Sequence, residues 1–212
     1  MKKYLVLGVL FVLPLVTYLF FASGVNNFMK LPVLTKGVGE VTDYRSLSGE
    51  SVSLEGNITI LGFFGNDIEF KRGNAFNLNQ KIYKRFYEFN DFQFVIVVPD
   101  TPENEKELIF LKSELNNLAD AHKWKFLFAS PSQVQTLFES LQSNYTLDEN
   151  YGSHQVFIID KESNLRGRKG DETLYGFDAR SVAEINNKME DDVKVLLAEY
   201  RLALKRNNRY QN

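Results

Sequence analysis

Three side chains of this sequence, His154, Asp67 and Glu69, are of types that bind metals or move protons. His154 lies just before a predicted strand, and the two carboxylates follow another predicted strand. An imidazole with carboxylates makes a weak site for Cu(II) or Zn(II) and a poor site for Cu(I), which prefers sulfur ligands. Because metal sites normally need several ligands, we favour the alternative that His154 is hydrogen-bonded at the edge of a sheet.

Asp67 and Glu69 could also form an acid–base pair. No nucleophile or oxyanion site lies beside them in the sequence, so a solvated polar loop is the better interpretation. The second histidine, His122, ends the leucine stripe of a predicted helix, and we interpret it as a capping or partly buried residue. The chain has no cysteine, which excludes disulfides, thiolate metal sites and cysteine nucleophiles within these 212 residues.

Composition indicates one folded domain. The 212 residues include 18 Phe and 10 Tyr, which is ample material for a hydrophobic core. The formal net charge is −2, so the chain lacks the basic signature of nucleic-acid binding. We therefore expect no nucleic-acid partner.

The N-terminus predicts a membrane anchor. Met1-Lys2-Lys3 precedes Tyr4 to Ala22, an uncharged apolar run of about the length that spans a bilayer core. We favour a retained anchor over a cleaved signal peptide, because this run is long for a signal peptide. The two lysines favour a cytoplasmic N-terminus, so the domain is expected on the periplasmic side of the inner membrane. The predicted division is an anchor at 1–24, a linker at 25–39 and a folded domain at 40–212.

Apolar runs and helical spacing predict a βαβ unit. Residues 57–64 form a mostly apolar, β-rich run, which is typical of a strand covered on both faces. In residues 74–89 the apolar side chains recur at helical spacing. Residues 92–98 predict the next strand, and two strands joined by a helix in this way are expected to be parallel.

The remaining elements extend this unit on both sides. Residues 40–53 alternate in part and predict a small hairpin or strand pair before the main sheet. Thr101-Pro102 and Ser130-Pro131 are N-terminal signals of two further helices. The other predicted elements are strands at 124–129 and 155–160, a returning hairpin strand at 165–169 and a long helix at 178–206.

Two basic clusters are present. Residues 166–169 hold two arginines and a lysine, which we interpret as a charged edge strand, with anion binding as the alternative. The end of the long helix carries Arg201, Lys205, Arg206 and Arg209. We interpret this end as solvated, with cations that suit the helix dipole. The alternative is a docking arm for a partner or for anionic head groups.

The order of elements resembles a thioredoxin-like layout with a peroxiredoxin-type extension. At residue level the chain resembles the SCO/SenC family, membrane-anchored proteins that deliver copper to, or service, cytochrome c oxidase. In that family a strand ending in Gly-Phe enters a Cys-x-x-x-Cys loop containing Pro-Asp-Ile. Here Leu61-Gly62-Phe63-Phe64 enters Gly65-Asn66-Asp67-Ile68-Glu69, which puts Gly65 and Glu69 at the two cysteine positions. The family's third copper ligand is a histidine just before a strand, and Gly152-Ser153-His154-Gln155 matches it.

The resemblance implies an α/β, thioredoxin-like sandwich of the SCO/peroxiredoxin type, with a central mixed sheet and an N-terminal transmembrane helix. It implies a protein partner, such as a respiratory oxidase subunit or an assembly factor. Because the cysteines are replaced, we expect a non-catalytic interaction factor without a resident cofactor rather than an enzyme. The alternative function is a copper metallochaperone that uses His154 with Glu69 and Asp67.

Overall fold

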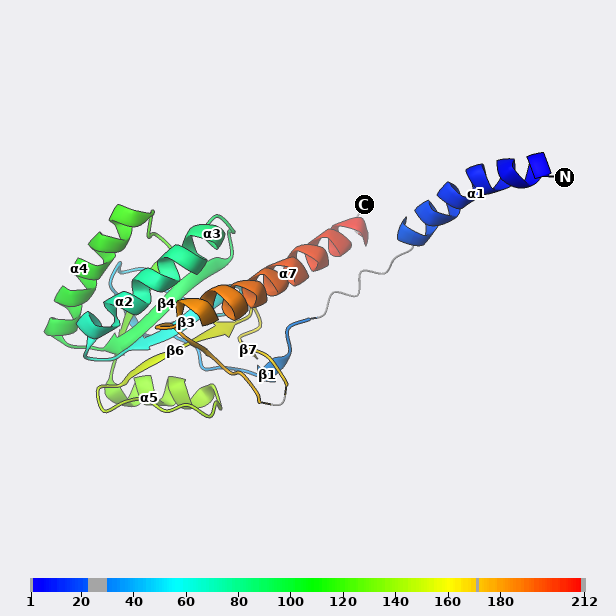
Figure 1. The fold of residues 1–212 in the computed structure, drawn as a ribbon. Coiled ribbons are helices and arrows are strands. Elements are labelled where there is room, and N and C mark those ends of the chain that lie inside the picture. The colour runs from blue at the N-terminus through cyan, green and yellow to red at the C-terminus, as the bar shows by residue number, and fades with distance from the viewer. Residues whose placement is uncertain (1, 23–29, 171, 211–212) are drawn as a thin grey trace.

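The computed structural model describes residues 2–22, 30–170 and 172–210. Figure 1 shows a central sheet with helices on both faces. The strands are β1 (Val33–Thr35), β2 (Arg45–Ser46), β3 (Ile58–Phe64), β4 (Phe92–Pro99), β5 (Trp124–Ala129), β6 (Gly152–Ile159), β7 (Leu165–Arg166) and β8 (Phe177–Asp178). The α-helices are α1 (Lys2–Ala22), α2 (Ile68–Leu78), α3 (Lys84–Phe86), α4 (Pro102–Leu118), α5 (Pro131–Ser140), α6 (Val182–Glu184) and α7 (Glu190–Tyr210). Two π-helical segments, η1 (Asn79–Tyr83) and η2 (Ile185–Met189), join α2 to α3 and α6 to α7.

Within the described residues, eight strands form one mixed sheet in the order β1-β7-β6-β3-β4-β5-β2, and β8 pairs with β6. β3, β4 and β5 are parallel, and β6 is antiparallel to β3. Every residue of β3 and β4 is buried, as expected of strands that helices cover on both faces. The βαβ unit and the strand at 124–129 are thus confirmed, whereas the strand predicted at 155–160 spans Gly152–Ile159. The fold is a thioredoxin-like α/β fold with a mixed central sheet.

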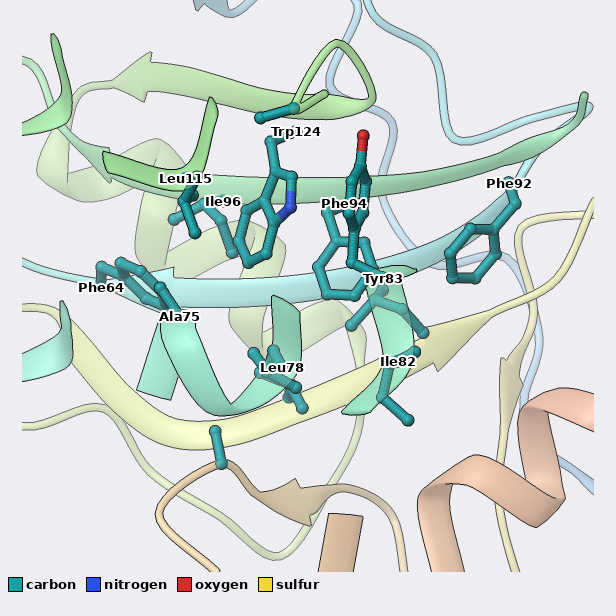
Figure 2. Packing of buried hydrophobic residues seen from close by; sticks show 14 of the residues in the cluster. Phe64, Ala75, Leu78, Ile82, Tyr83, Phe92, Phe94, Ile96, Leu115 and Trp124 are labelled. Atoms are coloured by element: carbon teal, nitrogen blue, oxygen red, sulfur yellow. The ribbon is translucent and has the colours of Figure 1, made fainter. Parts of the chain in front are cut away.

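The two faces of the sheet carry separate hydrophobic clusters. On one face α2, η1, α4, η2 and α7 pack against the sheet, and on the other face α5 packs with the buried apolar residues of segment 38–54. Figure 2 shows the first cluster, where Tyr83 and Phe94 lie beside Trp124. The rings of Phe94 and Trp124 are stacked with their centroids 4.5 Å apart. This aromatic packing fixes η1 over β4 and β5.

Helix-start signals in the sequence give correct boundaries. Thr101 caps α4 and accepts a hydrogen bond from the Asn104 amide, with Pro102 at the first helical position. Ser130 and Gln133 form the complete capping box of α5. The box satisfies amides that the first turn of a helix leaves without partners. The ends of β4 and β5 are therefore followed by helices at the predicted positions.

Several predicted boundaries are wrong. The hairpin at 40–53 does not form, because β2 pairs with β5 at one edge of the sheet. The helix predicted at 74–89 begins at Ile68 and passes through a π-helical segment. The long helix begins at Val182 rather than at residue 178, because β8 occupies residues 177–178. His122 does not cap α4, which ends at Leu118, and its side chain is exposed.

Part of the predicted linker at residues 25–39 belongs to the sheet of the folded domain. Residues 33–35, assigned to the linker by sequence, form β1 and pair with β7. Residues 23–29 lie outside the described part of the chain. Among the residues that are described, no helix is both long and apolar enough to cross a membrane. The anchor at Tyr4 to Ala22 therefore stays a prediction.

Candidate functional site

The loop that follows β3 is closed by a second loop from far along the chain. Gly65 has a φ of +66°, in the left-handed region that favours glycine. A Cβ atom at Gly65 would lie 2.3 Å from the carbonyl oxygen of Asn150 and 2.6 Å from the amide nitrogen of Gly152. The amide of Asn66 donates to the same Asn150 carbonyl at 2.8 Å. Loop 148–152 thus fills the space in which a side chain at residue 65 would stand.

Loop 148–152 is organised by the carboxylate of Asp148. Its Oδ1 accepts from the amides of Asn150 at 3.0 Å and Gly152 at 2.8 Å, and its Oδ2 lies 3.2 Å from Lys71 Nζ. Lys71 comes from α2 and is only 3% exposed. Burial raises the pKa of Asp148, but the Gly152 amide and the Lys71 ammonium outweigh it, so the pKa lies below its ordinary value. The Lys71–Asp148 pair therefore ties the loop to α2 in its charged form.

Asp67 and Glu69 have different surroundings. Asp67 Oδ2 accepts a hydrogen bond from the side-chain amide of Asn150, which adds a second link between the two loops. Glu69 is exposed in the first turn of α2, where its negative charge suits the helix dipole. Next to it, Phe70 is 82% exposed, the highest value among the exposed large apolar side chains of the described residues. The Asp67 carboxylate thus makes a contact between the two loops, and the Glu69 carboxylate lies at a solvated helix start.

His154 lies within β6, two residues after the strand begins at Gly152, and not before the strand as predicted. Its Nδ1 is 3.1 Å from the Asn74 side-chain nitrogen, so α2 and β6 are joined by this contact. Burial lowers the pKa of His154 below its ordinary value of 6.5, and the positive charges of Lys71 and Arg180 lower it further. The imidazole is thus neutral near pH 7, half-buried and engaged with an amide.

These residues do not fit a copper site. In the described part of the chain, no three His, Asp or Glu side chains come together as a group that could hold a metal ion. One ring nitrogen of His154, Nδ1, is already engaged by the Asn74 side chain. Cu(I) prefers sulfur ligands, and the sequence holds no cysteine. Metal binding by His154 with Glu69 and Asp67 therefore stays a hypothesis that the donor set does not favour.

The lowered pKa of His154 predicts a pH dependence. A histidine whose pKa is lowered by folding takes up a proton less readily in the folded state than in the unfolded state. The free energy of unfolding therefore falls as the pH drops through about 6.5, the pKa of histidine in the unfolded chain. His154→Gln should reduce this acid-induced loss in the free energy of unfolding. Denaturant titration at pH values above and below 6.5 measures it. In NMR spectra of the wild-type protein, the His154 ring should titrate below pH 6.5. A midpoint above that value would contradict the assigned surroundings.

Sequence reasoning missed three residues of this site. Lys71 and Asp148 are charged and read as surface residues, yet they form the pair that fixes the loop. A charged residue in the buried stripe of an amphipathic helix is the signal that identifies Lys71. Phe70 follows a polar loop and belongs to no apolar stripe, so no sequence pattern marks it. The exposure of a large aromatic side chain in a first helical turn is visible only in the structure.

Comparison with known proteins gives the fold. No family model and no curated protein matches the sequence. Among solved structures, BsSco, a member of the Sco family of cytochrome c oxidase assembly proteins, is similar over 78% of this chain and 95% of its own, with 18% identity and a TM-score of 0.55. A SCO1/SenC family lipoprotein from Bacillus anthracis is similar over 82% of this chain and 99% of its own, with 16% identity and a TM-score of 0.55.

A third similar structure widens the comparison beyond Sco proteins. It is a candidate protein disulfide isomerase from Bacteroides thetaiotaomicron, similar over 79% of this chain and 94% of its own, with 13% identity and a TM-score of 0.53. At these identities the likenesses concern the fold. The chain thus has a thioredoxin-like fold, and Sco-family proteins are among its structural neighbours.

Proposed function

We propose that this protein is a membrane-anchored, Sco-like assembly factor without thiol chemistry, which binds another protein during the biogenesis of a respiratory cytochrome oxidase. The observation that carries the proposal is the state of the two positions at which the SCO/SenC family has cysteines. Gly65 has no room for a side chain, and Glu69 is exposed to solvent. The thiolate is the nucleophile and the soft metal ligand in such sites, so this loop supports binding rather than redox catalysis.

The loop offers a rigid surface for a protein partner. Residues 65–67 are fixed by loop 148–152, and loop 148–152 is fixed by Lys71. Phe70 lies one helical turn before Asn74, whose side chain contacts His154. An exposed aromatic side chain on a preorganised surface is typical of the residues that dominate binding energy in protein interfaces. The likeness to an assembly protein of cytochrome c oxidase supports the choice of an oxidase subunit or assembly factor as partner.

The proposal includes a membrane anchor at Tyr4 to Ala22 and a domain on the periplasmic side. Large apolar side chains along α1 are exposed on all sides of the helix: Val6, Val9, Leu10, Phe11, Val12, Leu13, Leu15, Val16 and Leu19. A helix that is apolar all round is stable in a lipid bilayer rather than in water. Lys2 and Lys3 favour the cytoplasmic side for its N-terminus. Pro14 inside α1 is tolerated in membrane helices.

Replacing Phe70 by serine should abolish partner binding without affecting the fold. Because the ring is 82% exposed, its removal should change the free energy of unfolding by less than about 0.5 kcal/mol. Capture of oxidase subunits from detergent-solubilised membranes, detected with antibodies to those subunits, should fall at least about tenfold.

Ile109→Ser is the matched control for this variant. Ile109 is also a large apolar residue, 55% exposed, but it lies on α4. Capture by Ile109→Ser should equal capture by the wild-type chain. Equal capture by Phe70→Ser and the wild type would rule out the surface around Phe70, and absence of oxidase subunits from all captures would rule out the partner.

Copper delivery is the alternative function, and a titration separates it from the proposal. The purified chain is titrated with Cu(II) and, under reducing conditions, with Cu(I), beside the His154→Ala variant. We expect no binding that depends on His154, because its donor set lacks thiolates and its Nδ1 is engaged by Asn74. Tight binding that disappears in His154→Ala would restore the metallochaperone hypothesis.

A further inference from the structure

The C-terminal half of α7 leaves the body of the domain. Its apolar stripe is fully buried through Leu196, whereas Arg201 and Ala203 are exposed and Leu202 is 39% exposed. The helix nevertheless continues to Tyr210, and Figure 1 shows this end of α7 running beyond the sheet. Residues 201–210 correspond to about 15 Å of helix.

The sequence of this end is strongly basic. From Tyr200 to Asn212 it contains four basic residues and no acidic residue, whereas the chain as a whole has a net charge of −2. The basic residues are Arg201, Lys205, Arg206 and Arg209. Cations in the last turn of a helix suit the helix dipole, but the four basic residues here extend over more than two turns of sequence, which is more than that role needs.

A pocket of about 260 Å³ lies where α7 leaves the body. It combines apolar side chains with a cationic rim, and its lining includes Ile58, Phe89, Leu197, Tyr200, Lys161 and Arg201. Two carboxylates reduce the positive charge at this pocket: Asp91 forms an ion pair with Lys161, and Glu162 accepts a hydrogen bond from the Tyr200 hydroxyl. The pocket therefore fits a group with a negative head and a short apolar part better than it fits a bare anion.

Glu199, just before this end of α7, is tied to the start of the domain. Lys30 Nζ is 3.6 Å from Glu199 Oε1, and Arg166 bonds both to Glu199 and to the carbonyl of Leu31. Only eight residue steps separate Lys30 from Ala22, the last residue of α1, so the chain between them spans at most about 28 Å. With α1 in a bilayer, as the proposed function has it, the basic end of α7 is held close to the membrane surface.

Resting on that proposed anchor, we infer that the end of α7 and the adjacent pocket bind the anionic phospholipid head groups of the membrane that holds α1. The basic segment supplies the charge that negative lipids attract. The pocket beside Tyr200 receives one head group with the first methylenes of its chains. This contact orients the domain on the bilayer, since a single transmembrane tether leaves the domain free to tumble.

The test uses the full chain in lipid vesicles. Because the chain has no cysteine, Leu202→Cys gives a single labelling site on α7, and Glu107→Cys gives a control site on the exposed face of α4. Each variant, carrying a fluorophore, is reconstituted in vesicles of phosphatidylcholine with or without phosphatidylglycerol. Quenching by acrylamide in the aqueous phase measures exposure of the label.

The label at residue 202 should be quenched at least about threefold less in vesicles that contain phosphatidylglycerol, and high salt should remove the difference. Neutralising the four cations, with Arg201→Gln, Lys205→Gln, Arg206→Gln and Arg209→Gln together, should also remove it. The label at residue 107 should be quenched equally in both vesicles. If the chain floats with the vesicles but the label at residue 202 is quenched equally in both kinds, the inference is overturned and the proposed anchor is left intact. A chain that does not float with vesicles would overturn the anchor, and the inference with it.

Discussion

Gly65→Ala should lower the free energy of unfolding by about 3 kcal/mol, combining left-handed backbone strain with steric overlap. The added Cβ would lie 2.3 Å from the Asn150 carbonyl oxygen, 2.6 Å from the Gly152 amide nitrogen and 2.9 Å from the Gly152 Cα. All three atoms belong to backbone, which cannot rotate away as a flexible side chain can. Denaturant titration followed by circular dichroism measures the change. The loss would show that loop 148–152 closes the site in solution.

Gly37→Ala is the matched control. Gly37 has nearly the same φ, +67°, but nothing lies within 4 Å of an added Cβ atom. Its substitution should therefore lose only the cost of a left-handed alanine, about 1 kcal/mol. Equal losses for the two variants would mean that loop 148–152 does not occupy the position seen here. The larger loss at Gly65 would also explain why a cysteine at this position is incompatible with the present loop.

Arg166→Met should lower the free energy of unfolding by about 3 to 5 kcal/mol, because it leaves a buried carboxylate without its cation. Arg166 Nη1 is 2.9 Å from Asp160 Oδ2, and Asp160 is only 1% exposed. The same guanidinium contacts Glu199 on α7 at 2.7 Å and holds the carbonyl of Leu31. Thermal and denaturant unfolding would measure the loss. Because Arg166 joins the first described residues of the domain to α7, its removal should also loosen the basic end of that helix.

Two comparisons isolate this effect. Arg180→Met removes an arginine paired with Asp178 at 2.7 Å, but Arg180 is 59% exposed, so the change should stay within about 1 kcal/mol. Adding Asp160→Asn to Arg166→Met should recover part of the lost free energy of unfolding, because the double variant no longer has an unpaired buried carboxylate at residue 160. A loss below about 1 kcal/mol in Arg166→Met would show that Asp160 finds another partner or water. Arg166 and Arg168 therefore pair with acids of α7, and the predicted edge strand is wrong because β1 covers β7.

The central strands and helix starts could be predicted because their signals are local. β3 and β4 are continuous apolar runs, and the Thr101 and Ser130 caps are complete within four residues of sequence. The start of α2 was missed because Lys71 interrupts its apolar stripe. That lysine is buried only because Asp148, 77 positions away, supplies a counter-charge. β2 and β8 have two residues each, too few for an alternating pattern to be recognised.

The candidate site shows the same division between local and long-range information. His154 is recognisable by its position before an apolar run, but its contacts with Asn74 and the nearby Lys71 depend on how α2 packs against β6. The replacement of cysteines at residues 65 and 69 is visible in the sequence, whereas the reason that residue 65 cannot carry a side chain comes from Asn150 and Gly152. Long-range backbone packing leaves no local sequence pattern, so only the structure identifies it.

The most direct test of the proposed function is the amount of assembled cytochrome oxidase in membranes of the organism that carries this gene. Cells with the gene deleted are complemented with the wild-type chain, with Phe70→Ser or with Ile109→Ser, and assembled oxidase is measured by haem spectra and native gels. We predict that deletion lowers the oxidase several-fold, that wild type and Ile109→Ser restore it, and that Phe70→Ser does not, although it accumulates normally. An unchanged oxidase level in the deletion strain would contradict the proposed function.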